Sequence, residues 1–173
     1  MDQNLLEYTL RIGDNALILG QRLSEWCGHG PILEQDIALS NIALDHIGQA
    51  RMLMQYAAEQ KGADFTEDKM AFFRDIWEYR NALIVELENG DWAKTICRQF
   101  LFDTYNYYFY TALLSSADER LKEIAQKAIK EVSYHAQWSA EWIIRLGDGT
   151  EESHQKAQNA LNELWEWTGE LFE

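Results

Sequence analysis

Apolar residues recur every three or four positions along most of the chain, which is the spacing of one face of an α-helix. The first run covers residues 5–26 and forms one stripe of side chains: Leu5, Thr9, Ile12, Ala16, Leu19, Leu23 and Trp26. Within it, Gly13 and Gly20 would let a neighbouring helix approach closely. The letters CGHGP then interrupt the pattern, because glycine leaves the helical conformation easily and Pro31 fits the first turn of a new helix. We therefore expect two helices here, the second ending near Ala58.

The middle of the chain is a polar connection. Residues 61–70, KGADFTEDKM, contain few apolar side chains, and Thr66 is a typical N-terminal cap for a short helix. We expect that helix to carry aromatic side chains, namely Phe72, Phe73 and Trp77. The letters ELENGDW stop it, since Asn89 and Gly90 favour a turn. We interpret this segment as a crossover between two pairs of helices.

Helical spacing resumes in the second half of the chain. One long helix is expected through TICRQFLFDTYNYYFYTALL, residues 95–114. Another is expected from about Asp118 to Leu146, with a core stripe of Leu121, Ala125, Ala128, Val132, His135, Ser139, Trp142 and Leu146. GDGT ends this helix, and Thr150 opens a last one because its hydroxyl can cap the acidic first turn. Two pairs of long helices, a crossover and an additional helix predict an all-α four-helix bundle in a single domain, residues 1–173.

The charge and the hydrophobic content of the chain limit which kinds of partner we expect. The chain has a formal charge of -14 with 47% hydrophobic residues, which describes a folded protein that repels phosphate backbones and anionic lipid. We therefore expect no nucleic acid and no membrane as partners, and a basic subunit or substrate instead. No stretch approaches the ~18 apolar residues that span a bilayer, and the first residues lack the features of a secretory signal, so a cytoplasmic protein is expected. Cys27 and Cys97 are too few and too far apart for a disulfide framework or a thiolate metal cluster.

A metal centre is the first catalytic site that a four-helix bundle suggests. A carboxylate-bridged di-iron centre needs a Glu from two helices and a Glu-x-x-His from the other two, all facing inward. On the second helix the central acid is Asp45, and Gly48, three residues later, has no side chain to donate. On the fourth long helix the acid is Glu131, and Tyr134, three residues later, is a neutral phenol and a poor ligand. The sequence therefore lacks both imidazoles that such a centre requires.

The remaining polar candidates are isolated from one another in the sequence. His135 stands four residues after Glu131 on the expected core stripe. A structural pair of the two is favoured there, with a ligand role and metal-free catalysis as alternatives. Asp14 on the first helix and Asp103 on the third are lone carboxylates. Hydrogen bonding within the bundle is the simplest role for four polar residues: Asp14, Asn15, Asn41 and Asp45.

One true Glu-x-x-His occurs, in the letters EESH from Glu151 to His154. It lies in a first helical turn, where acids act as caps and side chains face water, so we interpret the match as coincidental. The chain shows no Gly-rich phosphate loop and no nucleophile elbow, and His29 and His46 have no obvious nucleophile beside them. The sequence therefore predicts no catalytic, cofactor-binding or metal-binding residue.

The chain has more aromatic side chains than one core stripe can bury. YNYYFY, from Tyr105 to Tyr110, places rings around the whole circumference of a helix, and WEWTGELF adds more near the last residue. Either a wide core beneath the crossover or a subunit interface would cover them, since Tyr and Trp provide contact area together with a polar group. A site for a small apolar molecule is a third hypothesis. These features favour binding or scaffolding over catalysis.

Several stretches resemble the C subunits of bacterial phenylacetyl-CoA epoxidases: LRIGDNALILGQRLSEWCGHGP, DIALSNIALDHIGQAR, FFRDIWEYRNALIVELENGDWAKTICRQFLFD and KAIKEVSYHAQWSAEWIIRLGDGT. The similarity is continuous along the chain, and the combination of LDHIGQAR, NGDWAKTICRQ and KEVSYHAQW is specific. The resemblance implies a ferritin-like fold. It also implies a structural, metal-free role beside a homologous catalytic A subunit in aerobic phenylacetate catabolism. In that family the di-iron centre lies in the A subunit, which uses electrons from NADPH to add one oxygen atom of O2 across the aromatic ring.

The resemblance thus implies no cofactor and no catalytic residue in this chain. Its main partner would be the A subunit, with further contacts to itself or to other members of the complex. Related proteins usually continue beyond the position of Glu173, so a C-terminal helical segment of the family is either absent from this protein or not represented in this sequence. The rival hypothesis is that the chain is itself a metal-dependent oxygenase or oxidase. Its divergent ligands would be Asp14, Asp45, Asp103, Glu131 and His135.

Overall fold

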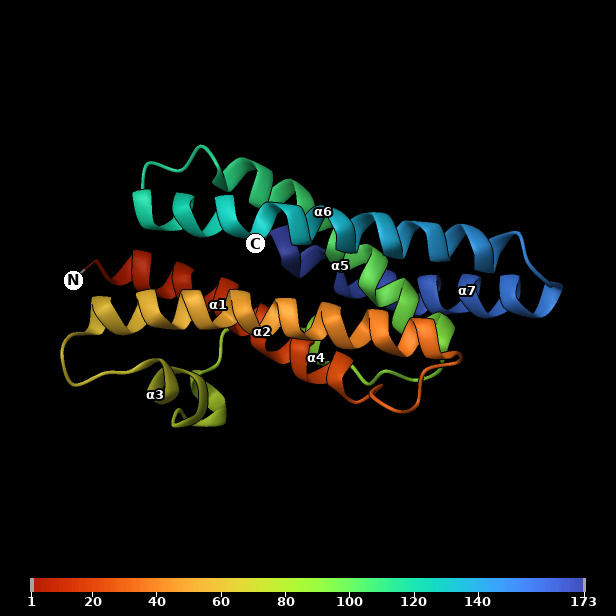
Figure 1. Ribbon diagram of the computed structural model, residues 1–173, viewed down its shortest axis with the longest axis horizontal. Coiled ribbons are helices and arrows are strands. Elements are labelled where there is room, and N and C mark those ends of the chain that lie inside the picture. The colour runs from red at the N-terminus through yellow and green to blue at the C-terminus, as the bar shows by residue number, and fades with distance from the viewer. Residues whose placement is uncertain (1, 173) are drawn as a thin grey trace. The chain divides into compact units, whose positions relative to one another are not determined.

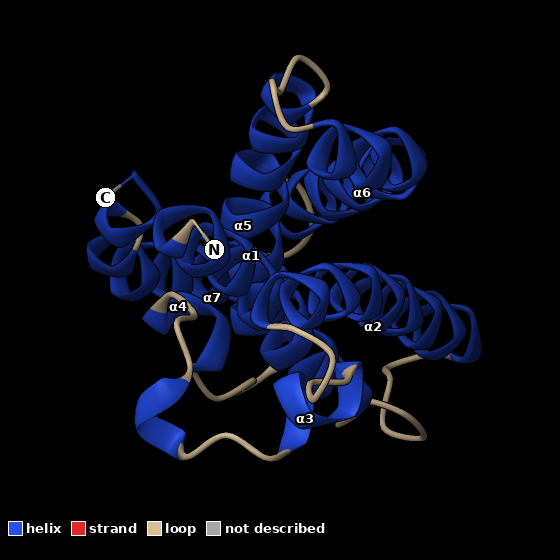
Figure 2. Ribbon diagram, turned by 90° about the vertical axis from the view of Figure 1, so that its left-hand side faces the viewer, coloured by secondary structure: helices blue, strands red, loops and turns tan. Residues whose placement is uncertain are grey.

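The computed structural model describes residues 2–172, and within them the chain is all-α. Helices and the loops between them account for these residues, without any strand (Figure 2). They form two compact units, Met1–Glu86 and Leu87–Glu173. Each unit contains one pair of long helices in contact, and the order of elements is that of a ferritin-like four-helix bundle with a long crossover and an additional helix, as the sequence predicts. None of the described helices combines the length and apolarity needed to cross a membrane.

The first unit is built on helices α1, Gln3–Ser24, and α2, Leu33–Lys61, which lie side by side (Figure 1). The carboxylate of Asp2 caps α1 by accepting the N–H of Asn4 at 3.0 Å. Apolar side chains from both helices form a shared core: Leu6, Leu10, Ala16, Leu17, Ala50, Met54, Ala57 and Ala58. Of the stripe predicted for the first helix, Ala16 belongs to this core, and Thr9, Ile12, Leu19 and Leu23 are also buried. The two ends of the stripe are not: Leu5 and Trp26 are half-buried, and Trp26 lies beyond the end of α1.

Two glycines of α1 set its distance from α2. A Cβ built on Gly13 would lie 3.0 Å from Met54 Cε, and one built on Gly20 would lie 3.2 Å from the carbonyl oxygen of Ala43. Both distances are shorter than ordinary van der Waals contacts, so a Cβ at Gly13 would displace the end of the Met54 side chain and one at Gly20 would press on the backbone of α2. The close approach predicted from the glycine spacing is confirmed.

The second helix begins slightly later than the sequence suggests. Its first residue is Leu33, and Pro31 lies outside it rather than in the first turn. The carboxylate of Asp36 accepts the N–H of Gly30 at 3.0 Å, which holds the segment before the helix in a turn. An acidic side chain of the first helical turn thus replaces the proline as the feature that starts the helix.

The crossover consists of three short helical pieces, α3, η1 and α4, at Glu67–Phe72, Ile76–Glu78 and Leu83–Glu86. Thr66 caps α3 as predicted, since its hydroxyl accepts the N–H of Lys69 at 3.2 Å. The first piece packs on α2 and the last packs on α1. The crossover therefore follows the first helical pair closely.

The expectation that one short helix carries Phe72, Phe73 and Trp77 is wrong, because α3 ends at Phe72. Asp75 starts a new turn instead. Its own N–H donates to the carboxylate of Glu78 at 2.8 Å, and its carboxylate accepts backbone N–H groups of that turn. This reciprocal cap stabilises a separate 3₁₀ turn, η1, in place of a continued helix.

The second unit contains α5, α6 and α7 followed by two 3₁₀ turns, η2 and η3, at Trp92–Leu113, Glu119–Gly147, Glu151–Leu164, Trp165–Trp167 and Gly169–Phe172. Helix α5 contacts both α6 and α7. Side chains cap all three helices at their starts: Asp91, Asp118 and Thr150. The turn predicted at Asn89 and Gly90 is present, and Gly90 has a φ of 62°, which favours glycine.

The predicted stripe of α6 faces the interior. Its first six positions, from Leu121 to Ser139, are buried, and the last two, Trp142 and Leu146, are half-buried. The indole of Trp92 on α5 packs edge-on against Trp142, with ring centroids 5.2 Å apart. Helical periodicity therefore identified the core-facing residues of this element.

Candidate functional site

A buried carboxylate on α1, Asp14, is bound by the crossover. The guanidinium of Arg74 donates from Nη1 to Oδ2 at 2.9 Å and from Nη2 to Oδ1, and the backbone N–H of Arg80 donates to Oδ2 at 2.8 Å. Both side chains of the ion pair are almost fully buried. Burial raises the pKa of Asp14, while the hydrogen bonds and charge of Arg74 and the N–H of Arg80 oppose that shift. These protein donors occupy both carboxylate oxygens, so Asp14 anchors the crossover to α1.

Arg74 makes further contacts that fix its side chain. It donates to the backbone carbonyls of Met70 and, at 3.1 Å, Glu78, and its guanidinium lies 4.3 Å from the ring centroid of Tyr79. We call Asp14, Arg74, Tyr79 and Arg80 the crossover anchor. Sequence reasoning missed it. An arginine placed between FF and DIW could have signalled a buried cation that needs a carboxylate.

The two asparagines that the sequence singles out on the first helical pair have different surroundings. Asn15 Oδ1 accepts the N–H of Ala82 at 2.7 Å, so its predicted hydrogen bonding is confirmed. Asn41 is exposed, so its expected place inside the bundle is wrong.

On α2, Asp45 is half-buried and Gly48 is exposed, and a Cβ built on Gly48 would meet no atom of the described residues within 4 Å. The inward-facing polar residues of this helix are His46 and Gln49, one position beyond the predicted pair. An inward Glu-x-x-His frame that starts at Asp45 therefore does not fit this helix.

On α6, too, a buried polar residue lies one position beyond the pair with the three-residue spacing. Tyr134 is 48% exposed and Glu131 is half-buried, while His135 is fully buried, as its stripe position predicts. The tyrosine therefore points away from the interior, so the three-residue frame from Glu131 does not lead into the core. The pairing of Glu131 with His135 stays a prediction.

Two residues of the rival ligand set do lie together within the second unit. Asp103 on α5 is 1% exposed, and one of its carboxylate oxygens lies within 4.8 Å of a ring nitrogen of His135. Burial raises the pKa of Asp103 to about 6, against the opposing charge of His135, the hydroxyl of Ser139 and the charge of Arg98. The pair is a buried acid and imidazole from adjacent helices, which can share a proton or hold a polar ligand.

The one Glu-x-x-His match lies at the junction of α6 and α7. His154 is exposed, and its Nδ1 lies 2.9 Å from the carbonyl oxygen of Gly147. Thr150 and Ser153 form a reciprocal cap, with the Ser153 N–H 3.1 Å from the threonine hydroxyl. These contacts close helix ends, so the interpretation of EESH as a coincidental match fits its position.

The two cysteines are free thiols in different surroundings. Cys27 is exposed, and Cys97 is buried. Burial, with a further contribution from the negative charge of Asp91, raises the pKa of Cys97 to about 12. Its thiol therefore stays protonated and unreactive near neutral pH.

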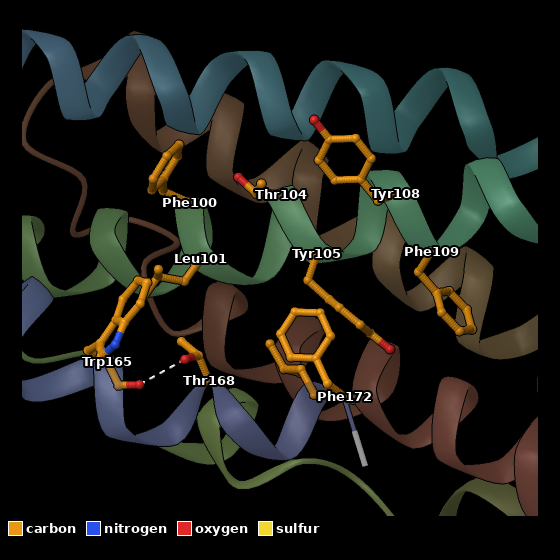
Figure 3. A pocket seen from close by; sticks show the side chains of 10 residues that line it. Phe100, Leu101, Thr104, Tyr105, Tyr108, Phe109, Trp165, Thr168 and Phe172 are labelled. Carbon is orange, nitrogen blue, oxygen red and sulfur yellow. Dashed lines mark hydrogen bonds between the residues drawn. The ribbon is translucent and has the colours of Figure 1, made fainter.

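Aromatic residues of α5 and the two C-terminal 3₁₀ turns line an open groove of about 630 Å³ (Figure 3). Tyr105 stacks on Phe109, and the ring of Phe172 stands edge-on to Tyr105, each with centroids 5.6 Å apart. The hydroxyl of Thr168 donates to the carbonyl of Trp165 at 2.8 Å. The two aromatic motifs of the sequence thus meet in one surface. Among the described residues, no charged side chain lines it, so the groove suits an apolar segment or molecule.

Comparisons with known proteins give the family of this chain. The model of a family described as "Phenylacetic acid catabolic protein" matches residues 1–173. The chain is also similar to the C subunit of the 1,2-phenylacetyl-CoA epoxidase of Escherichia coli strain K12. The two are 52% identical over 169 residues, which cover 98% of this chain and 68% of that protein. This chain belongs to the family of phenylacetic acid catabolic proteins.

Proposed function

We propose that this chain is a non-catalytic structural subunit of a multicomponent phenylacetyl-CoA epoxidase, in which it pairs with and stabilises a homologous catalytic A subunit. The similarity to an epoxidase C subunit over nearly the whole chain supports this assignment. The di-iron centre of the complex would belong to the catalytic subunit.

The crossover anchor is the observation that carries the proposal. An inward carboxylate of the first helix is what a di-iron bundle would use as a metal ligand, and here Arg74 and Arg80 hold it through three hydrogen bonds. A bound metal would have to displace a buried guanidinium, whose charge would then lack a partner. Together with the exposed positions of Gly48 and Tyr134, this favours a structural role.

One observation supports the rival function, a metal-dependent oxygenase or oxidase with a divergent ligand set. Asp103 and His135 are both buried and close together, and a carboxylate with an imidazole is a plausible start for an iron site. This pair supplies two ligands from the second unit. A di-iron centre needs several more carboxylates.

Metal analysis separates the two functions. The chain is purified alone from cells grown with added iron, and bound iron is measured by plasma mass spectrometry. We expect an iron content near zero per chain. A content near two irons per chain would overturn the structural role. The Asp103→Asn variant, prepared in parallel, shows whether any bound iron depends on the buried pair.

Pairing is tested independently of metal. The chain is co-expressed with a tagged catalytic subunit, and the purified material is analysed by size-exclusion chromatography with light scattering. We expect a stable complex of both chains and a larger soluble yield of the catalytic subunit than when it is expressed alone. Elution of this chain as a separate monomer would contradict the proposal.

A further inference from the structure

Large apolar side chains are exposed along the crossover. Phe72 is 63% exposed, Phe73 79%, Ile76 73% and Trp77 81%. We call these residues the crossover patch. They lie within six consecutive positions of the first unit, on α3, on η1 and between them. A cluster of this kind facing water is costly unless another molecule covers it.

The backbone beneath the patch is held in place by buried contacts. Arg74, in the middle of the segment, points inward and binds Asp14 and two backbone carbonyls. The hydroxyl of Tyr79 donates to the carbonyl of Ala71 at 2.6 Å, which joins the two ends of the segment. The apolar side chains are therefore presented by a fixed scaffold, and fixing them in advance lowers the entropy lost on binding.

The charges beside the patch favour a basic partner. Asp75 and Glu78 flank Ile76 and Trp77, both are exposed, and within residues 2–172 neither forms an ion pair. Arg74 stands between the two phenylalanines and these carboxylates in the sequence, but its guanidinium is paired with Asp14. The other cation at η1, Arg80, donates to the carbonyl of Trp77 at 2.9 Å and pairs with Glu7 at 2.7 Å. The two carboxylates at η1 thus take part in no ion pair among the described residues.

The lysines nearby are directed elsewhere. The ammonium of Lys69 donates to the carbonyl of Asp64 at 2.6 Å, and that of Lys61 lies 4.8 Å from the ring centroid of Phe65.

A second copy of this chain is a poor partner for the patch, because it would bring together two proteins that each carry a charge of -14.

From these observations we propose that the crossover patch docks a different protein subunit, one that offers an apolar pocket for Trp77 and Phe73 and is ringed by Lys and Arg side chains. This inference rests on the proposed function, in which that subunit is the catalytic one. Aromatic anchors with a charged rim are the usual source of affinity and orientation at such interfaces.

The aromatic groove of the second unit provides matched controls. Trp165 is 67% exposed and lies in a 3₁₀ turn, as Trp77 does, and Phe172 is 79% exposed, as Phe73 is. The groove differs from the crossover patch in one respect, because Phe172 already packs against Tyr105 within the fold. Truncating each pair to alanine removes the same side chains at similar exposure from two different surfaces.

The test measures by biolayer interferometry how tightly each variant binds the tagged catalytic subunit. It compares Trp77→Ala and Phe73→Ala with Trp165→Ala and Phe172→Ala. We expect the crossover variants to bind at least about tenfold more weakly and the groove variants to bind within about twofold of the unmodified chain. Neutralising the charge with Glu78→Gln, which keeps an oxygen to accept the N–H of Asp75, should slow association most at low salt. Circular dichroism melting verifies that each variant is folded.

The outcomes separate this inference from the proposed function. If the unmodified chain and the crossover variants bind the catalytic partner equally well, the patch is the wrong surface and the pairing stands. If the unmodified chain does not bind, both proposals fail. A dimer of this chain alone that Trp77→Ala dissociates would also overturn the inference. Amide hydrogen exchange of residues 70–80 in the unmodified complex gives a measurement without mutation: protection is expected, and its absence would contradict the patch.

Discussion

At the scale of single residues, two buried carboxylates have different surroundings. Asp14 is held by a guanidinium and a backbone N–H, whereas Asp103 lies beside an imidazole with its pKa raised to about 6. In the first, both carboxylate oxygens accept hydrogen bonds and the charge of Arg74 balances that of Asp14, although burial still raises its pKa. The second is costly to ionise, so its effect on stability depends on pH.

Asp14→Asn should be one of the most destabilising conservative changes in the chain. It leaves the buried guanidinium of Arg74 without a counter-charge, and losing one partner of a buried ion pair costs about 3–5 kcal/mol. Urea unfolding followed by circular dichroism measures the change. The double variant Asp14→Asn/Arg74→Met should recover part of the loss, because it removes the unpaired charge. Equal stability of Asp14→Asn and the unmodified chain would show that the ion pair contributes nothing.

Asp103 should make the chain less stable as pH rises from about 4 to about 6. Below its ordinary pKa of 3.8 the carboxyl is protonated in both states, and between that value and about 6 only the unfolded chain releases the proton. The unfolded state is thereby favoured by up to about 3 kcal/mol, and the cost is constant above pH 6. Asp103→Asn removes this titration, so its stability relative to the unmodified chain should increase over the same interval. Urea unfolding from pH 4 to pH 7 tests this, and a constant difference would contradict it.

At the scale of elements, the long helices and their caps could be predicted from the sequence because both signals are local. Stripe spacing identified the buried face of α6, and Thr66 and Thr150 were recognised as caps. The crossover could not be predicted to the same detail. The attachment of this segment to α1 depends on Arg74 reaching Asp14, sixty positions earlier, and no local pattern records such a contact.

Glycine positions offer a matched test of the helix contact. Gly20→Ala places a Cβ 3.2 Å from the backbone carbonyl of Ala43, which cannot move as a side chain can, so we expect a loss of about 1–2 kcal/mol. Gly48→Ala meets no atom of the described residues within 4 Å and should stabilise α2 by about 0.5–1 kcal/mol. Thermal and urea unfolding of the two variants should therefore shift in opposite directions. A gain from Gly20→Ala would show that the helices separate easily.

At the scale of the whole molecule, the sequence correctly indicated the fold class and the family. It placed His135 correctly on the core stripe but misjudged how Asn41 faces. The pairs Asp45 with Gly48 and Glu131 with Tyr134 were chosen by spacing alone, whereas the buried polar residues lie one position further along, at His46 and His135. Helical spacing gives the angle between two side chains, and tertiary packing decides which of them turns inward.

The proposed role predicts how an assembled epoxidase responds to a change in this chain. Glu131→Gln removes the acid of the candidate ligand frame on α6 with little change of shape. We expect the purified complex to retain turnover within about twofold once it is normalised for assembled protein. The measurement is NADPH-dependent epoxidation of phenylacetyl-CoA, with size-exclusion chromatography as the control for assembly. A fully assembled complex without turnover would assign a chemical role to this chain.

The crossover anchor also imposes an order on folding. Its carboxylate belongs to the first helix and its arginine to a segment that leaves the ribosome sixty residues later, so the two can meet only after the helical hairpin between them has closed. The crossover patch consequently reaches its final geometry at the end of this order of folding. An immature chain lacks this surface, so the proposed docking would select molecules whose first half has already folded.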